Sequence, residues 1–247
     1  MNHILYNLTQ IRLRIAKACL HAGRNPEEVK LLLATKTVSV ENIKIALNAG
    51  EVLIGENKVQ EVKEKYEGLK TIPHEKHFIG YLQTNKIKDI LKYDVACIQS
   101  IDRIDLAEKL HQRLDKVQRK MDILIQVNTS AEESKFGVSP ENAIELVKHI
   151  SQFDSLQIKG LMTIGLFSSD KKKVRKCFKI LTTLQREINL QNIPNVEMKE
   201  LSMGMSGDLE IAIEEGATIV RVGTAIFGQR VYPDSYYWDE SKAKKCD

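Results

Sequence analysis

The sequence predicts a single (β/α)₈ barrel of the TIM-barrel type, with an extra helix before the first strand. Short apolar runs alternate with longer stretches of helical periodicity about eight times within 247 residues, which matches one such barrel. The runs are continuously apolar, as in 123–125 (Ile-Leu-Ile), and this is typical of parallel strands covered on both faces. An open doubly wound sheet would carry a glycine-rich turn after its first strand, whereas residues 33–37 (Leu-Ala-Thr-Lys-Thr) contain no glycine.

The chain begins with a stretch that predicts a packed helix ending near Gly23. The same stretch is basic and lacks acidic residues, which faintly resembles a mitochondrial transit peptide. One face, however, carries a single stripe of apolar residues at helical spacing, namely Ile4, Leu8, Ile11, Ile15 and Ala18. This stripe favours a helix that belongs to the folded domain, and we therefore expect a cytoplasmic protein.

Eight strands and seven further helices are expected in alternation. The expected strands are Lys30–Thr35, Val52–Gly55, His77–Gly80, Val95–Ser100, Met121–Asn128, Gln157–Thr163, Glu200–Met203 and Ile219–Val222. The expected helices are Val40–Asn48, Asn57–Tyr66, Thr84–Lys92, Arg103–Arg119, Pro140–Phe153, Lys171–Ile188 and Asp208–Glu215. Ser139 before Pro140 is a typical helix start, and Gly50 and Gly216 are typical helix ends. With no linker composition in between, residues 1–231 are expected to form one domain and 232–247 a polar tail.

The composition argues against several classes of partner. The 37 basic and 33 acidic residues leave a charge of +4, too small an excess to indicate nucleic acid or an anionic membrane. No apolar stretch approaches the roughly 18 to 20 residues of a membrane span. The cysteines are scattered and lack metal-ligand spacing, so we expect no metal site, no disulfide framework and a reducing compartment: Cys19, Cys97, Cys177 and Cys246.

Two turns predict an anion site at the carboxyl ends of the last two strands. Residues 202–208 follow the seventh strand and bring Ser206 and Gly207 before a helix. Gly223 and Thr224 follow the eighth strand. Like the first turn, they offer a flexible glycine, a side-chain hydroxyl and exposed backbone amides. Barrels of this kind often hold phosphate at this place. The two turns together therefore predict a phosphate cradle.

Lys36 stands at the end of the first strand, beside the predicted cradle. A lysine at a barrel mouth with apolar walls is expected to have a lowered pKa, so that its neutral amine can form a Schiff base with an aldehyde. An aldehyde that also carries a phosphate describes pyridoxal 5′-phosphate (PLP). Arg221, at the end of the last strand, would face the pyridine nitrogen and could only donate a hydrogen bond. The alternatives from the residues alone are a solvated Lys36 and a structural salt bridge at Arg221.

At this point the chain resembles the pyridoxal phosphate homeostasis family, whose barrel is similar to the N-terminal domain of alanine racemase. The segments that carry the resemblance are 34–37, 55–57 with 60–61, 77–80 through 82–83 to 85–86, 160–162, 201–207, and 220–224 with 226–228. The resemblance implies that Lys36 carries PLP, that Arg221 faces its ring nitrogen, and that Asn57, Met203 and His77 line or neighbour the pocket. It also implies that Ser206, Gly207, Gly223 and Thr224 hold the phosphate. One departure is Lys76, where the family commonly has an aromatic residue.

The resemblance further implies a protein that buffers or delivers PLP without robust catalysis. We expect it to be a monomer, with apo PLP-dependent enzymes as partners. An amino-acid racemase is the main alternative. Such an enzyme needs a second base, a tyrosine from another all-β domain, and only 17 residues follow Arg230 (247 − 230). A barrel aldolase that uses Lys36, or an RNA-binding role for the basic run 171–173, are the remaining alternatives.

Overall fold

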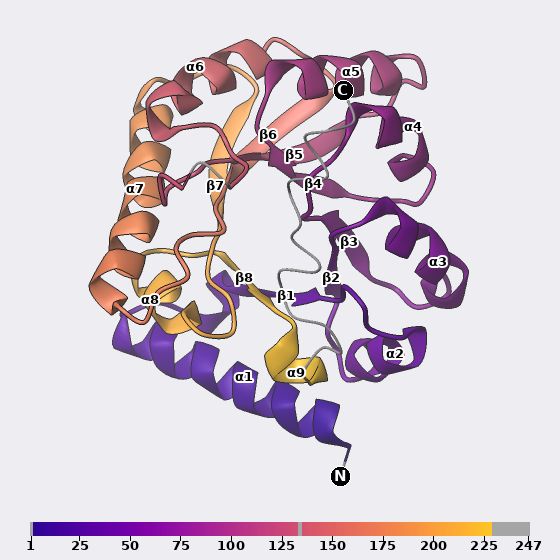
Figure 1. Ribbon diagram of the computed structural model, residues 1–247, viewed down its shortest axis with the longest axis vertical. Helices are drawn as coiled ribbons and strands as arrows, with labels where there is room; N and C mark the ends of the chain where they lie inside the picture. The colour runs from indigo at the N-terminus through magenta and orange to yellow at the C-terminus, as the bar shows by residue number, and fades with distance from the viewer. Residues whose placement is uncertain (1, 133–134, 229–247) are drawn as a thin grey trace.

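The structure, a computed structural model that describes residues 2–132 and 135–228, is a closed barrel of eight parallel strands (Figure 1). Each strand pairs with the next along the chain, and the last pairs with the first, where Val222 lies beside Leu33. Helices surround the barrel (Figure 1). The predicted TIM barrel is therefore confirmed. The predicted boundary at residue 231 and the tail 232–247 lie outside the described residues.

The elements follow in strict alternation after the first helix. The strands are β1 (Lys30–Ala34), β2 (Leu53–Glu56), β3 (Glu75–Phe78), β4 (Cys97–Ile101), β5 (Met121–Gln126), β6 (Leu156–Met162), β7 (Val196–Ser202) and β8 (Ile219–Val222). The α-helices are α1 (His3–His21), α2 (Val40–Asn48), α3 (Val59–Leu69), α4 (Ile87–Ile90), α5 (Ile104–Asp115), α6 (Pro140–Ile150), α7 (Lys171–Leu190), α8 (Leu209–Glu214) and α9 (Thr224–Phe227). Two short 3₁₀ helices are η1 (Pro26–Glu28) and η2 (Thr84–Lys86).

The N-terminal helix α1 is the predicted extra helix, and it packs outside the barrel against α8, α9 and α2 (Figure 1). The Asn2 side chain accepts a hydrogen bond from the Ile4 amide and caps its start. Gly23, with φ of +66°, follows its end. The predicted apolar stripe is buried: Ile4, Leu8, Ile11, Ile15 and Ala18. This burial explains why the stretch folds onto the barrel.

The hydrophobic core has two levels. A large cluster lies between the barrel and its helices, and two small clusters fill the interior of the barrel. One interior cluster comprises Leu32, Leu53, Ile79 and Ile219, and the other comprises Cys97, Leu124 and Met162. None of the helices in the described part of the chain has the length and hydropathy needed to cross a membrane.

Lys76, the departure from the family pattern, is accommodated on the outer face of β3. Its ammonium group donates to the Tyr93 carbonyl at 2.9 Å and lies 5.0 Å from the centre of the Tyr66 ring. Burial lowers the pKa of Lys76. Lys76 is thus buried with a partner for its charged end, and β3 keeps its pairing with β2 and β4.

Candidate functional site

A pocket of about 140 Å³ opens at the carboxyl ends of the barrel strands. Its lining residues are Ala34, Lys36, Asn57, Ile79, Met162, Ile164, Phe167, Met205, Ser206, Gly207, Arg221, Gly223 and Thr224. Seven of the predicted site residues are therefore brought together: Lys36, Asn57, Ser206, Gly207, Arg221, Gly223 and Thr224. The pocket lies where a barrel of this kind places its working face.

The other two predicted residues, His77 and Met203, do not line this pocket. The His77 ring lies inside the barrel and is hydrogen-bonded away from the pocket. Met203 is fully buried in the large cluster between barrel and helices. Gly204 then turns the chain with φ of +89°, so that Met205 reaches the pocket instead.

The sequence analysis missed the apolar part of the lining. Ile79 lies two residues after His77, so the alternation of side chains along a strand places both on the same face. This alternation could have predicted Ile79 from the sequence. Ile164 and Phe167 come from the loop after β6, and Phe167 is 65% exposed. Nothing in the periodicity of that loop distinguishes these two residues from ordinary loop residues.

Lys36 is buried at the pocket wall, and both of its chain neighbours are held in place. On one side, the Thr35 hydroxyl donates to the Glu56 carboxylate at 2.6 Å. On the other side, the Thr37 amide donates to the Glu61 carboxylate at 2.7 Å, and Thr37 has φ of +63°. A non-glycine residue in this left-handed region is strained and keeps the conformation only when its surroundings hold it there. The backbone that carries Lys36 is therefore held rigidly.

The two carboxylates behind Lys36 share one buried ammonium group, that of Lys65 on α3. Its Nζ lies 2.8 Å from Glu56, 2.8 Å from Glu61 and 2.8 Å from the Thr35 carbonyl oxygen. Burial raises the pKa of Glu56 to about 7, against the opposing effect of Lys65. Burial also acts to raise the pKa of Glu61, but hydrogen bonds from Lys65 and the Thr37 amide outweigh it and lower that pKa. This cluster braces Lys36 from outside the barrel.

The turns after β7 and β8 present unpaired amides in the same pocket. Among the hydrogen bonds of residues 2–132 and 135–228, the backbone N–H groups of Ser206, Gly207, Gly223 and Thr224 donate to no acceptor. A Cβ at Gly207 would meet no atom within 4 Å, so the first turn is open. Converging free amides form an anion-binding site and suit phosphate. The structure thus brings the two turns together in one pocket, as the sequence predicts.

The first of these turns is tied to the N-terminal helix. The Arg14 guanidinium on α1 donates to the Ser206 carbonyl at 2.9 Å and to both oxygens of Glu210, at 2.6 and 2.9 Å. Within the turn, the Met205 amide donates to Asp208 at 2.6 Å. The carbonyl of Ser206 is therefore engaged on the α1 side, which leaves its amide for the pocket.

Arg221 is buried at the base of the pocket. Its guanidinium donates to the Ser202 hydroxyl at 2.9 Å and to the Thr163 carbonyl at 2.7 Å. Burial lowers the pKa of Arg221 to about 10, while the Asp208 charge acts to raise it. The group therefore stays cationic at neutral pH and acts only as a donor.

Asn57 supplies an unsatisfied acceptor to the site. Its side-chain oxygen is buried and has no hydrogen-bond partner among the described residues. The end of β3 packs tightly against its backbone, because a Cβ at Gly80 would lie 2.0 Å from the Asn57 carbonyl oxygen. A buried polar atom without a partner is uncommon and is consistent with a missing ligand donor. In the described part of the chain, no three His, Cys, Asp or Glu side chains gather to hold a metal ion.

Fold and site together define a class of barrel, in which a buried lysine follows the first strand and amide-rich turns follow the last two. In agreement with this, the family model described as alanine racemase, N-terminal domain, matches residues 7–231. The chain is 47% identical over 225 residues to the pyridoxal phosphate homeostasis protein of Aquifex aeolicus, covering 91% of this chain and 97% of the relative. It is 40% identical over 228 residues to the protein of that name from Pasteurella multocida, covering 92% and 97%. The chain belongs to the pyridoxal phosphate homeostasis protein family.

Solved structures agree with this assignment. A protein from Bifidobacterium adolescentis described as unknown superposes with a TM-score of 0.88 at 42% identity, covering 91% of this chain and 94% of that chain. PipY of Synechococcus elongatus, solved with PLP bound, superposes with a TM-score of 0.76 at 32% identity, covering 87% and 100%. An alanine racemase of Clostridium difficile has a TM-score of 0.76 at 13% identity and shares the fold alone, with 95% of this chain matched to 58% of that chain.

Proposed function

We propose that the protein binds PLP and acts in intracellular PLP homeostasis, as a buffer or carrier of the cofactor. One observation carries the proposal: a buried lysine, a buried arginine and four unpaired backbone amides line one pocket. PLP offers a matching aldehyde, ring nitrogen and phosphate. The names of the relatives and the PLP-bound structure of PipY support the same ligand.

The residues present fit this cofactor group by group. The primary amine of Lys36 would bind the aldehyde, and the amides of the two turns would bind the phosphate. The Asn57 oxygen would accept a hydrogen bond that no residue in 2–132 or 135–228 donates to it. Apolar side chains would contact the ring, namely Ile79, Met162 and Ile164.

Arg221 would set the electronic character of the bound group. PLP supplies an electron-withdrawing pyridine ring, which is strongest when its nitrogen is protonated. Because the Arg221 guanidinium can only donate, it would leave that nitrogen unprotonated. Enzymes that need a strong electron sink use a carboxylate at this place. Arg221 therefore suits storage of the cofactor better than a reaction that requires a strong electron sink.

An amino-acid racemase is the second candidate, favoured only by the shared fold. That reaction needs a second acid or base across the ring from the lysine. No tyrosine is among the described residues that line the pocket, and Tyr232, Tyr236 and Tyr237 lie outside the described residues. Incubation with L-alanine tests this alternative, and a turnover to D-alanine above about 1 s⁻¹ would favour a racemase.

Borohydride reduction followed by peptide mass mapping tests PLP binding directly. We expect one pyridoxyl label, on the peptide that contains Lys36, and no label in Lys36→Ala. Lys135→Ala is the matched control, because Lys135 donates to the Gly165 carbonyl at 2.8 Å near the mouth but does not line the pocket. A label on another peptide would overturn the site, and no label on the wild type would overturn PLP binding.

We also infer that the protein is a cytoplasmic monomer that passes PLP to apo-enzymes and has no nucleic-acid or membrane partner. Light scattering should give a mass near 28.1 kDa. Mixing the PLP-loaded protein with an apo PLP-dependent enzyme should restore that enzyme faster than PLP released into dialysate does. Equal rates would indicate that the protein buffers PLP but does not deliver it to the apo-enzyme.

A further inference from the structure

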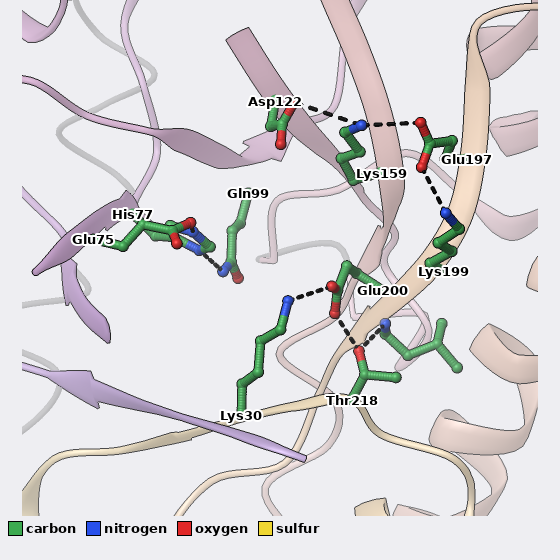
Figure 2. Close-up of polar contacts among 11 residues, drawn as sticks. Lys30, Glu75, His77, Gln99, Asp122, Lys159, Glu197, Lys199, Glu200 and Thr218 are labelled. Atoms are coloured by element: carbon green, nitrogen blue, oxygen red, sulfur yellow. Dashed lines mark hydrogen bonds and ion pairs between the residues drawn. The ribbon is translucent and has the colours of Figure 1, made fainter. Parts of the chain in front are cut away.

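A line of polar side chains crosses the interior of the barrel and ends at Arg221. His77 Nε2 lies 2.6 Å from a Glu75 carboxylate oxygen, and His77 Nδ1 lies 2.6 Å from the Gln99 amide nitrogen. The Gln99 amide oxygen lies 2.6 Å from the Ser202 hydroxyl, which accepts from Arg221 at 2.9 Å. Figure 2 shows His77 between Glu75 and Gln99. The line joins β3, β4, β7 and β8.

Apart from Glu75, whose side chain is 57% exposed, the line is buried in the interior of the barrel. Gln99 and Ser202 are fully buried, and His77 and Arg221 are only 6% and 5% exposed. Interiors of such barrels are usually filled with branched apolar side chains. Polar groups there cost free energy unless every one finds a partner. The line therefore needs a reason beyond packing.

The donors and acceptors along the line have one consistent direction. Arg221 can only donate, so the Ser202 oxygen accepts and its proton is free for the Gln99 carbonyl oxygen. The Gln99 amide group then donates to His77 Nδ1, and His77 Nε2–H donates to Glu75. This pattern requires a neutral His77 with its proton on Nε2 and an ionised Glu75. The hydrogen bond from His77 lowers the pKa of Glu75 in agreement with this.

We propose that His77, Gln99 and Ser202 form a relay of positioning residues that orients Arg221 toward the cofactor pocket and links it to Glu75 at the opposite mouth of the barrel. The proposal rests on the proposed function, in which Arg221 faces the ring nitrogen. The guanidinium is held by two hydrogen bonds, to the Ser202 hydroxyl and to the Thr163 carbonyl. Without the first anchor it can turn about the second, and its hydrogen bond to the ring loses direction.

A second network at the same mouth provides a matched control. Lys159 lies 3.1 Å from Glu197 and 3.9 Å from Asp122, and Glu197 also pairs with Lys199 at 3.0 Å (Figure 2). No hydrogen bond or ion pair joins Lys159, Glu197 or Lys199 to the relay or to Arg221, although the charges of Glu75 and His77 affect the pKa of Asp122. Lys159→Met therefore removes a polar network of the same barrel mouth while leaving the hydrogen bonds of the relay in place.

The first experiment needs no cofactor. ¹⁵N NMR of the ligand-free protein at pH 8 should show His77 as the Nε2–H tautomer, with Nδ1 accepting a hydrogen bond. In Gln99→Leu, the Nδ1 signal should lose that hydrogen-bond shift. A wild-type His77 with its proton on Nδ1 would overturn the relay.

The second experiment measures PLP affinity and the absorption spectrum of bound PLP. Ser202→Ala and Gln99→Met should raise the dissociation constant about tenfold, as for loss of a hydrogen bond to a charged group, and shift the absorption maximum. Ser202→Thr, which keeps the hydroxyl, and Lys159→Met should match the wild type in both. Wild-type values in Ser202→Ala, with its fold intact by circular dichroism, would overturn the relay. Failure of the wild type to bind PLP would overturn the proposed function instead, and the NMR result would still decide the relay.

Discussion

Lys36 depends on side chains that never reach the pocket. Thr35 and Thr37 are held by Glu56 and Glu61, and both carboxylates converge on Lys65. Removal of one partner from such a buried ionic cluster leaves charge without compensation. The backbone on either side of Lys36 is thus held by electrostatic contacts on the outer side of the barrel.

Lys65→Met should destabilise the protein by about 3–5 kcal/mol, because Glu56 and Glu61 would lose their shared cation. Urea denaturation measures this loss. The double variant Lys65→Met/Glu56→Gln should recover part of it, since one of the uncompensated acids is removed. A single variant as stable as the wild type would contradict the role given to Lys65.

Gly80→Ala should destabilise the protein by about 1–3 kcal/mol through overpacking, because the new Cβ would lie 2.0 Å from the Asn57 carbonyl oxygen. Gly207→Ala is the matched control, since a Cβ there meets no atom within 4 Å and stability should stay within about 0.5 kcal/mol. Chemical denaturation compares the two. Equal stabilities would show that the backbone after β3 can shift to make room for a Cβ at Gly80.

At the scale of elements, α1 supports the turn after β7, which we propose binds the phosphate, and also covers the barrel. Arg14 joins this helix to the Ser206 carbonyl and to Glu210 on α8. Arg12, half a turn away, pairs instead with Glu51. Of these two arginines of α1, Arg14 therefore contacts the turn after β7 and Arg12 does not.

Arg14→Ala should weaken PLP binding roughly threefold, because the turn proposed to hold the phosphate loses an exposed ion pair and a hydrogen bond. Arg12→Ala should leave PLP affinity unchanged, although it removes an arginine from the same helix. Fluorescence titration with PLP gives both constants. Equal losses in the two variants would indicate a general effect of α1 on the barrel.

The sequence predicted which elements exist better than where they begin. The limits of α2 and β8 agree with the prediction, whereas β7 begins at Val196 and not at Glu200. Charged and apolar residues alternate at the start of β7, and Glu197 pairs with Lys159 at the amino-terminal mouth. A search for apolar runs overlooks such residues, because side chains at a barrel mouth face water and can pair there. The predicted helix 84–92 divides into η2 and α4.

At the scale of the whole molecule, the sequence predicted the site residues that have distinctive chemistry and directly follow a strand. Lys36, Arg221 and the two turns follow strand ends, and a closed barrel brings all strand ends to one face. It did not predict contacts that depend on side-chain direction inside the barrel. His77 is the clearest case, because only the structure shows that its ring bonds to Glu75 and Gln99.

The stability of the whole molecule should depend on pH through Glu56. Its pKa is raised from 4.5 in the unfolded chain to about 7 in the fold by burial. A raised pKa contributes stability that is fully present below about pH 4.5 and is lost as the pH rises through about 7. The loss amounts to roughly 3 kcal/mol at most, from 1.36 kcal/mol per pKa unit. The pKa of Glu61 is lowered in the fold, so its contribution to stability has the opposite pH dependence. That contribution is present above the unfolded pKa of 4.5 and is lost as the pH falls through the lowered pKa of the folded protein.

Urea denaturation between pH 5 and pH 8 therefore distinguishes the wild type from Glu56→Gln, in which the titrating group is replaced by an amide of the same shape. The free energy of unfolding of the wild type should fall over this range relative to that of the variant. The amide also retains an oxygen that can accept from Lys65 and Thr35, so the variant is expected to fold. Parallel curves would mean that Glu56 stays ionised beside Lys65 throughout, and that burial does not govern its proton.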